Sequence, residues 1–132
     1  MKNPIAVNHE EQIELTPSLE NYLEAIFTLE QPEGKAVRLT DISQLLSVSK
    51  ASVNRAIRTL KQNGLVHHEH YGTVGLTTSG KLRAEEIYRR HTVLQYFLTD
   101  FLGVDPVLAE KEACLMEHSI RTVKLQEQSL LL

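Results

Sequence analysis

The spacing of apolar residues predicts a mainly helical chain with one small β-hairpin. Thr16-Pro17 begins the first helix, because Thr caps a helix and Pro fits its first turn. The apolar side of this helix consists of Leu19, Tyr22, Leu23, Ile26, Phe27 and Leu29. Residues 1–15 show no clear period, and we expect them to form a flexible arm.

Between Arg38 and Gly64 the pattern indicates two short helices around a tight turn. Leu39-Thr40-Asp41 begins the first of them, and Ser49 can cap a second helix over residues 50–63 that ends at Gly64. The residues of this second helix that face inward are Val53, Ala56, Ile57 and Leu60. The pattern is typical of a helix-turn-helix, whose second helix can enter the major groove of DNA. An ordinary helical hairpin is the alternative.

The outward face of the second helix carries side chains that suit DNA. Arg and Asn match base edges, while Lys, Arg and Ser bind phosphates. Residues 38–90 hold nine basic and four acidic side chains, whereas the whole chain holds 14 and 17. This basic middle favours a nucleic-acid partner over chance clustering on solvated helices. The predicted DNA-contacting residues are Arg38, Lys50, Ser52, Asn54, Arg55, Arg58, Lys61 and Tyr71.

Residues 65–70 and 73–77 indicate two short strands joined by a turn at Tyr71-Gly72. A hairpin directly after a recognition helix is a wing. His67, His68 and His70 resemble a metal cluster. Alternation, however, places His68 and His70 on one face of the strand and His67 on the other, so a solvated wing is favoured.

A long helix is predicted from Thr78-Ser79-Gly80 to about Phe101, and Gly103 ends it. Its apolar stripe consists of Leu82, Ile87, Leu94, Leu98 and Phe101. His91 lies within that stripe. Two interpretations stay open for it, a satisfied core or interface group and a metal ligand.

Asp105-Pro106 begins one more helix, which carries a candidate metal site. Residues at i, i+3 and i+4 share a helix face, so Cys114, Glu117 and His118 point toward one place. A thiol, a carboxylate and an imidazole together suit Fe(II), Mn(II), Co(II) or Zn(II). The alternative is a polar helix face with one small buried thiol.

Other side chains are candidate donors to the same site. Asn21 and Glu24 share one side of the first helix and offer oxygen atoms, although solvent exposure is favoured unless a partner site exists. Glu110 lies four residues before Cys114 and is a further ligand or a partner of one. Two antiparallel helices would place His91 opposite Cys114.

Several classes of protein are excluded by what the sequence lacks. A single cysteine excludes an internal disulfide and fits a reducing cytosol. No apolar run reaches the roughly 18 residues of a membrane span. There is no His-Glu-x-x-His pattern, nucleophile elbow or Gly-rich phosphate loop, so no enzyme is predicted. The terminal run 129–132 is apolar and suits a dimer interface, a groove or a frayed end.

Taken together, residues 16–26, the helix-turn-helix with its wing, Arg90-His91 and residues 112–118 resemble the DtxR/MntR family of metal-dependent transcriptional repressors. The resemblance covers about residues 16–120. It implies a cytoplasmic homodimer that binds double-stranded DNA at a palindromic operator and represses metal-uptake genes when Mn(II) or Fe(II) is bound. Zn(II) or Co(II) would substitute in vitro.

The resemblance also implies a domain plan and a set of ligands. A winged helix-turn-helix domain over 16–78 would precede a helical metal-binding and dimerisation domain over 79–132, C-terminally short and without an SH3-like domain. A shortened tail would weaken the dimer. By position in the manganese branch, the ligands become Asn21, Glu24, His91, Cys114, Glu117 and His118.

The ligand run mixes two branches of the family. Cys-x-x-Glu-His is the iron-branch pattern, and Cys114 favours a softer ion such as Fe(II). Glu24 keeps a manganese-type ligand, whereas Asn21 is neutral and weaker than the Asp of that branch. Glu110 stands where the iron branch has an ancillary-site His, which would allow a second metal. The alternatives are a winged-helix regulator that senses a phenolic or redox signal through Cys114, and a dimerisation module without a metal response.

Overall fold

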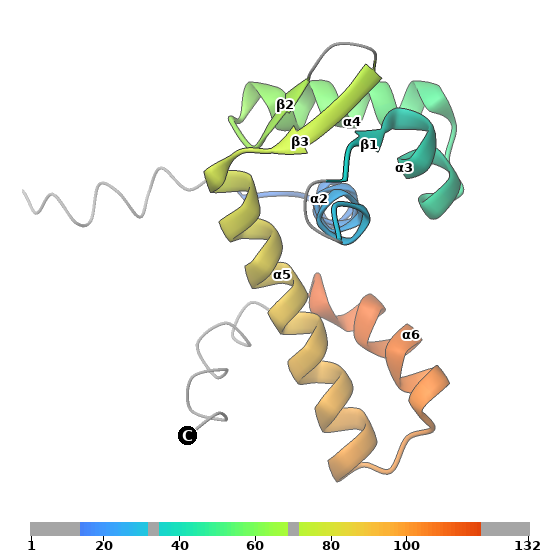
Figure 1. Cartoon of the computed structure of the whole chain (residues 1–132). Helices are drawn as coiled ribbons and strands as arrows, with labels where there is room; N and C mark the ends of the chain where they lie inside the picture. The colour runs from blue at the N-terminus through green and yellow to red at the C-terminus, as the bar shows by residue number, and fades with distance from the viewer. Residues whose placement is uncertain (1–13, 32–34, 69–71, 120–132) are drawn as a thin grey trace, which may run out of the picture.

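The computed structural model describes residues 14–31, 35–68 and 72–119. It is mainly helical, with a small antiparallel sheet, so the predicted fold class is confirmed (Figure 1). Within the described ranges, no helix combines the length and apolar character needed to cross a membrane. The elements in chain order are α2 (Pro17–Leu29), β1 (Val37–Arg38), α3 (Leu39–Leu46), α4 (Lys50–Gln62), β2 (Val66–His68), β3 (Thr73–Leu76), α5 (Thr78–Tyr96), η2 (Phe97–Phe101) and α6 (Pro106–Glu117).

The helices α3 and α4 form the predicted helix-turn-helix. Ser47 ends α3 in the left-handed conformation, with φ of 56°. Ser49 then caps α4, because its Oγ accepts a hydrogen bond from the Ser52 backbone N–H at 3.1 Å. All four residues predicted to face inward from α4 are buried. The local signals for this motif were therefore sufficient to place both helices.

The wing is a three-stranded antiparallel sheet in the order β1-β3-β2. The strands β2 and β3 were predicted, and Val66 pairs with Leu76 and His68 with Val74. The strand β1 was not predicted, because two residues carry no alternating pattern. It joins the sheet through the pairing of Val37 with Val74.

The histidines of the wing do not form a metal group among the described residues. His67 and His68 are both exposed. A Cβ at Gly75 would lie 2.7 Å from the His67 ring, so glycine makes room for the imidazole on the neighbouring strand. His70 and the predicted DNA contact Tyr71 lie outside the described residues.

The end of α2 is bonded to the sheet. Glu30, the C-cap residue of α2, accepts a hydrogen bond from the Leu76 backbone N–H at 3.1 Å. The strand β1 pairs with β3 at Thr73 and Val74 only. Beyond Val74, the carboxylate of Glu30 therefore accepts the hydrogen bond that a longer β1 would otherwise accept from β3.

The main core lies where α2, α3, α4 and the sheet meet the first half of α5. Its most buried side chains include Leu23, Ile26, Ile42, Val53 and Leu60. Leu15 is also buried in this core, so its assignment to a flexible arm is wrong. An apolar residue directly before a helix cap can pack beneath the helix without belonging to any periodic pattern. Residues 1–13 lie outside the described residues.

The start of α5 is fixed against the wing. Thr77 caps α5 by accepting a hydrogen bond from the Gly80 backbone N–H at 3.0 Å, and its hydroxyl donates to the Gly64 carbonyl at 2.7 Å. A Cβ at residue 80 would overlap the Leu65 carbonyl oxygen. Glycine at this position allows the helix to approach the strand closely, which sets the direction in which α5 leaves the core.

Beyond the core, α5 continues through the π-helical turn η2 and reverses at Gly103, and α6 packs back along it (Figure 1). Leu82 and Phe101, predicted to face inward, are instead 62% and 69% exposed. Leu82 precedes Ile87 by five residues, which is about 140° around a helix. Phe101 is the last residue of the wider π-helical turn, which shifts its face relative to the preceding helix. The stripe predicted from one uniform period was wrong at both of its ends.

Candidate metal centre

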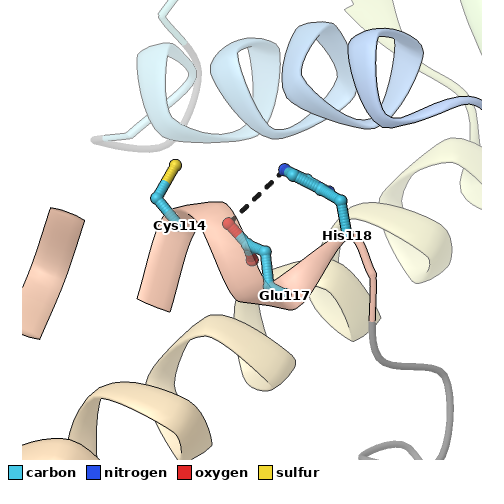
Figure 2. A group of neighbouring side chains, drawn as sticks. All are labelled: Cys114, Glu117 and His118. Carbon is cyan, nitrogen blue, oxygen red and sulfur yellow. Dashed lines mark ion pairs between the residues drawn. The ribbon is translucent and has the colours of Figure 1, made fainter. Parts of the chain in front are cut away.

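Three potential ligands lie on one face of α6, as their spacing predicts. The Asp105 side chain accepts backbone hydrogen bonds at the start of α6, and Pro106 occupies the first turn. Figure 2 shows Cys114, Glu117 and His118 on the side of α6 that faces α2. Their potential ligand atoms all lie within 4.8 Å of one another.

Two alanines bring α6 close to α5. Ala109 and Ala113 are fully buried in a small second core with Leu94 and Leu98. Side chains this small allow helix axes to approach closely. Glu117 follows Ala113 by one helical turn, and it is therefore held directly against α5.

A second group of potential ligands joins three helices. It consists of Glu24 from α2, His91 from α5 and Glu117 from α6, again with potential ligand atoms within 4.8 Å of one another. Glu117 belongs to both groups. The structure therefore brings five candidate ligands together. Glu117 is shared, and the other four are Glu24, His91, Cys114 and His118.

Glu117 is the buried centre of this arrangement. It is 0% exposed. Its Oε1 lies 3.3 Å from His91 Nδ1 and 3.6 Å from His118 Nε2. Its Oε2 is buried without a hydrogen-bond partner among the described residues. A buried carboxylate oxygen normally has a partner, because leaving it unpaired costs roughly 1–3 kcal/mol.

The protonation of Glu24 reflects the same crowding. Burial, followed by the nearby charge of Glu117, raises the pKa of Glu24 to about 7 against the opposing effect of His91 and His118. Glu24 therefore keeps its proton to a higher pH than an ordinary glutamate does. Two carboxylates face each other here with too little positive charge to keep both ionised.

Nearby carboxylates also raise the pKa values of the other three donors. The hydrogen bond to Glu117 raises the pKa of His91, and the hydrogen bond to Glu20 raises the pKa of His118. Burial and then the charge of Glu117 raise the pKa of the Cys114 thiol. In the absence of a cation, all these groups favour the protonated state.

The donor set fits a divalent transition metal. Ligand distances of about 2.0–2.3 Å place opposite donors about 4–4.6 Å apart, which the spacing within each group allows. A cation would supply the missing partner of Glu117 Oε2 and the charge that both glutamates lack. Imidazole, carboxylate and thiolate suit Fe(II), Zn(II) or Mn(II) better than Ca(II), which prefers oxygen ligands.

Two residues to which the sequence analysis assigned no role border the centre. Glu20 Oε1 lies 2.7 Å from His118 Nδ1, and Glu20 Oε2 accepts a hydrogen bond from Arg90 Nη2 at 2.9 Å. Both Glu20 and Arg90 are buried. Each directly precedes a residue considered as a ligand, namely Asn21 and His91. A charged residue beside a ligand on a mostly buried helix was the available signal.

The remaining candidate ligands occupy different positions. Asn21 Oδ1 lies 2.7 Å from His118 Nε2, the ring nitrogen that faces Glu117. Asn21 therefore contacts the centre through His118. Glu110 is exposed and belongs to neither group of potential ligands in the described part of the chain. Its charge contributes to the raised pKa values of His91 and Cys114.

The candidate DNA-binding residues lie on the helix-turn-helix. Ser52 is half-buried and accepts a hydrogen bond from Arg55 Nη2 at 3.3 Å. This contact orients the Arg55 guanidinium along the N-terminal half of α4. The remaining described candidates are exposed: Arg38, Lys50, Asn54, Arg58 and Lys61. The exposed candidates of α4 lie opposite its buried face, where a partner can reach them.

Comparison with known proteins gives concordant matches over most of the chain. Residues 14–74 match the family of iron-dependent repressor N-terminal DNA-binding domains. Residues 77–126 match the family of iron-dependent repressor metal-binding and dimerisation domains. An uncharacterized HTH-type transcriptional regulator of Methanocaldococcus jannaschii is 31% identical over 106 residues, which are 80% of this chain and 85% of that protein.

Solved structures resemble this fold as well. A manganese-dependent transcriptional repressor in complex with manganese superposes with a TM-score of 0.76 at 30% identity and covers 86% of this chain. IdeR of T. acidophilum gives a TM-score of 0.73 at 26% identity and covers 91% of it. The chain spans about half the length of these two proteins, 52% and 55% respectively.

Proposed function

Because this chain belongs to the DtxR/MntR family of metal-dependent transcriptional repressors, we propose that it is a DNA-binding repressor activated by a divalent cation. The genes under its control would be those of metal uptake, and we place it in the cytoplasm, where the DNA is. We assign it no catalytic role. The observation that carries this function is the buried carboxylate of Glu117, shared by potential ligands from three helices.

The proposed metal ligands are Glu24, His91, Cys114, Glu117 and His118, with Asn21 as a weak or indirect contributor. Bound there, a divalent cation would neutralise the two glutamates and bind α2 to α5 and α6. Glu24 lies on α2, the helix that also packs against α3 and α4. Fixing α2 relative to α5 and α6 therefore fixes the DNA-binding helices relative to the rest of the subunit. The cation would favour this fixed arrangement of the helices only as far as it binds this arrangement more tightly than other arrangements of the same subunit.

The residues of α4 would then divide the work of DNA binding. Lys50, Ser52, Arg58 and Lys61 suit phosphates, which supply affinity and position the helix. Asn54 and Arg55 suit the base edges of adenine and guanine in the major groove. Arg38 at the start of α3 and Tyr71 in the wing complete the proposed set.

Self-association follows from the match to a dimerisation domain and from the exposed apolar side chains near η2. The rings of Tyr96 and Phe97 each contact that of Phe101, and the three side chains remain 60%, 43% and 69% exposed in that order. Exposed aromatic clusters of this kind are typical of protein interfaces. A homodimer would present two copies of α4 to the two halves of a palindromic operator.

The identity of the cation depends mainly on Cys114. A thiolate prefers a softer ion, so Fe(II) is favoured over Mn(II), whereas Glu24 and Glu117 suit both. Zn(II) and Co(II) would occupy the same ligands in vitro. Replacing Cys114 by Glu would convert the site to oxygen and nitrogen donors only. We expect Cys114→Glu to shift the preference toward Mn(II), measured as the ratio of Mn(II) and Fe(II) concentrations that half-saturate DNA binding.

The decisive experiment is anaerobic binding to DNA from upstream of the gene that encodes this protein. Chelator, Mn(II), Fe(II) and Zn(II) would be compared at one fixed salt concentration, because DNA affinity depends steeply on salt. Binding should be tight with Fe(II) or Mn(II) and weak with chelator. Glu117→Gln and His118→Ala should remove the metal response while leaving circular dichroism unchanged.

The matched control for these variants is Glu112→Gln. Glu112 lies on the same helix but is exposed and outside both ligand groups. Its loss should leave the metal response intact. Equal DNA binding with chelator and with metal would leave a DNA-binding protein without this switch.

The second candidate function, redox sensing through Cys114, has weaker support. Cys114 is exposed, but burial of its thiol and the charge of Glu117 raise its pKa. A thiol with a raised pKa holds less thiolate, which is the form that oxidants attack. A response to peroxide in the presence of chelator, lost in Cys114→Ser, would favour this alternative.

A further inference from the structure

Glu20 connects three helices at the edge of the proposed metal centre. From α2, one oxygen of its carboxylate lies 2.7 Å from His118 Nδ1 of α6, and the other accepts a hydrogen bond from Arg90 Nη2 of α5 at 2.9 Å. The side chains of Glu20 and Arg90 are each 10% exposed, and that of His118 is 7% exposed. This is a buried and specific arrangement, in contrast to a surface ion pair, which contributes little.

We propose that Glu20 is the positioning residue of the metal centre, that it sets the tautomer and orientation of His118, and that Arg90 holds Glu20 in place. This inference rests on the proposed function. A histidine ligand usually donates its second ring N–H to a carboxylate or carbonyl, which fixes the ring and the nitrogen left for the metal. With Nδ1–H donated to Glu20, His118 presents Nε2 to the centre.

The positions of the surrounding atoms agree with this assignment. His118 Nε2 lies 3.6 Å from Glu117 Oε1, so it is the ring nitrogen that faces the shared carboxylate. It also lies 2.7 Å from Asn21 Oδ1, which can only accept, so without a cation Nε2 carries a proton that a bound metal ion would replace. Glu20 and Asn21, at adjacent positions of α2, thus contact the two nitrogens of one imidazole. Glu20 contacts Nδ1, and Asn21 contacts Nε2.

The positive charge of Arg90 allows the carboxylate of Glu20 to lie beside the cluster that contains Glu24 and Glu117. Without a cation beside it, Glu20 would add to the repulsion that already favours a protonated Glu24. Burial opposes the ionisation of Glu20, but hydrogen bonds from His118 and Arg90 outweigh burial and lower its pKa. Arg90 directly precedes His91 on α5, so one turn of that helix supplies both a proposed ligand and the cation that holds the positioning carboxylate.

The test uses the full chain loaded with Zn(II), a diamagnetic ion that permits NMR of the histidine rings. Glu20→Gln keeps the shape of the side chain but removes its charge, and Glu112→Gln is the matched control on the surface of α6. We expect Glu20→Gln to weaken Zn(II) affinity by about 10–100-fold, as loss of an outer-shell partner does. Long-range ¹H–¹⁵N spectra should show His118 protonated at Nδ1 in the wild type and a loss of that single tautomer in Glu20→Gln.

A role in folding alone would not change the tautomer of one histidine. Arg90→Lys supplies a second variant, because it keeps the charge but shortens the reach, and it should weaken Zn(II) binding less than Glu20→Gln. Unchanged affinity and an unchanged His118 spectrum in Glu20→Gln would overturn the inference. A loss as large as that of His118→Ala would identify Glu20 as a ligand and would overturn it too.

Failure of the proposed function is distinguishable from failure of this inference. Wild-type protein that binds no Zn(II) would refute the metal centre itself, and the positioning role would fall with it. Wild-type protein that binds Zn(II), together with a Glu20→Gln variant that matches it in both Zn(II) affinity and His118 spectrum, would refute only the positioning role.

Discussion

The two halves of this chain are held together by different interactions. The winged half encloses a large apolar core with contributions from α2, α3, α4, the sheet and α5. The helical half has a small core of Leu94, Leu98, Ala109 and Ala113, and beside it a cluster of acids, histidines and one thiol. Apolar burial stabilises the first half without any ligand, whereas the cluster, to which α2 contributes Glu24, contains charges that only a cation or protons can balance.

This difference assigns separate tasks to the two halves. A DNA-binding domain with a complete apolar core does not need a cation to keep its shape. A helical half with an unbalanced polar cluster and an exposed aromatic patch would, under the proposed function, change its preferred arrangement with the cation and with a partner. Mutations in the two halves should therefore separate stability from metal response.

The largest effect should come from the core of the winged half. Leu60 is 0% exposed, and Leu60→Ala should cost about 2–5 kcal/mol of unfolding free energy because it removes buried methyl groups and leaves a cavity. Urea unfolding with chelator and with Zn(II) should show the same loss. A loss confined to the chelator sample would contradict the independence of the two halves.

Overpacking the contact between α5 and α6 should separate the ligands. Ala113→Leu places a large side chain where the residue is 0% exposed, which should cost about 1–3 kcal/mol. It should also weaken Zn(II) binding, because Glu117 would move away from His91. The same substitution at Ala56 in the main core should destabilise the protein but keep the Zn(II) stoichiometry, measured by calorimetry. Equal Zn(II) binding in both variants would show that close helix approach is not required.

The metal-free protein should become less stable as pH rises. The pKa of Glu24 is about 7 in the folded chain against an ordinary value of 4.5, so the folded state holds the proton more tightly and loses stability between those two values. His91 and His118 have raised pKa values, so their contribution is present below pH 6.5 and is lost as pH rises through the raised values.

The raised pKa of Glu24 and the raised pKa values of the two histidines both make the free energy of unfolding fall as pH rises. Unfolding free energy in chelator should fall by on the order of 2 kcal/mol between pH 5 and pH 8. Glu24→Gln should make the fall shallower. Stability that rises with pH over this window would refute the protonated cluster. Glu20 acts in the opposite direction, since its lowered pKa makes stability fall as pH drops below 4.5.

The smallest effect on folding should come from the exposed aromatic patch. Phe101 is 69% exposed, so Phe101→Ser should change monomer stability by only about 0.5 kcal/mol. It should nevertheless weaken self-association by tenfold or more, measured by analytical ultracentrifugation. Leu45→Ser, at a 50% exposed position of the winged half, is the control and should leave association unchanged. Similar association of both variants with the wild type would place the dimer contact elsewhere.

Local signals were enough to predict most of the fold. Capping residues and helical spacing placed the helices to within a few residues, because Thr16, Ser49 and Asp105 act on their own backbone neighbours. The strand β1 and the burial of Leu15 could not be predicted, because both depend on contacts with residues distant in the sequence. The domain division at residue 78 stays a prediction.

The candidate site divides in the same way. The spacing of Cys114, Glu117 and His118 follows from helix geometry alone, and the family resemblance indicated Glu24 and His91. Glu20 and Arg90 could not be identified, because their roles arise from a contact across 70 residues of sequence. Their positions directly before Asn21 and His91 are visible in the sequence, but those positions do not show that the two charges pair with each other.

The hydrogen bond from Leu76 to Glu30 has a mechanical consequence. Glu24 and Glu30 are six residues apart on one stiff helix, a distance of about 9 Å, and neither end of that segment can move without the other. A displacement of a tenth of a nanometre at the ligand end would be transmitted almost undiminished to strand β3. Hydrogen exchange at the single amide of Leu76, which donates to Glu30, would then register whether the site is occupied.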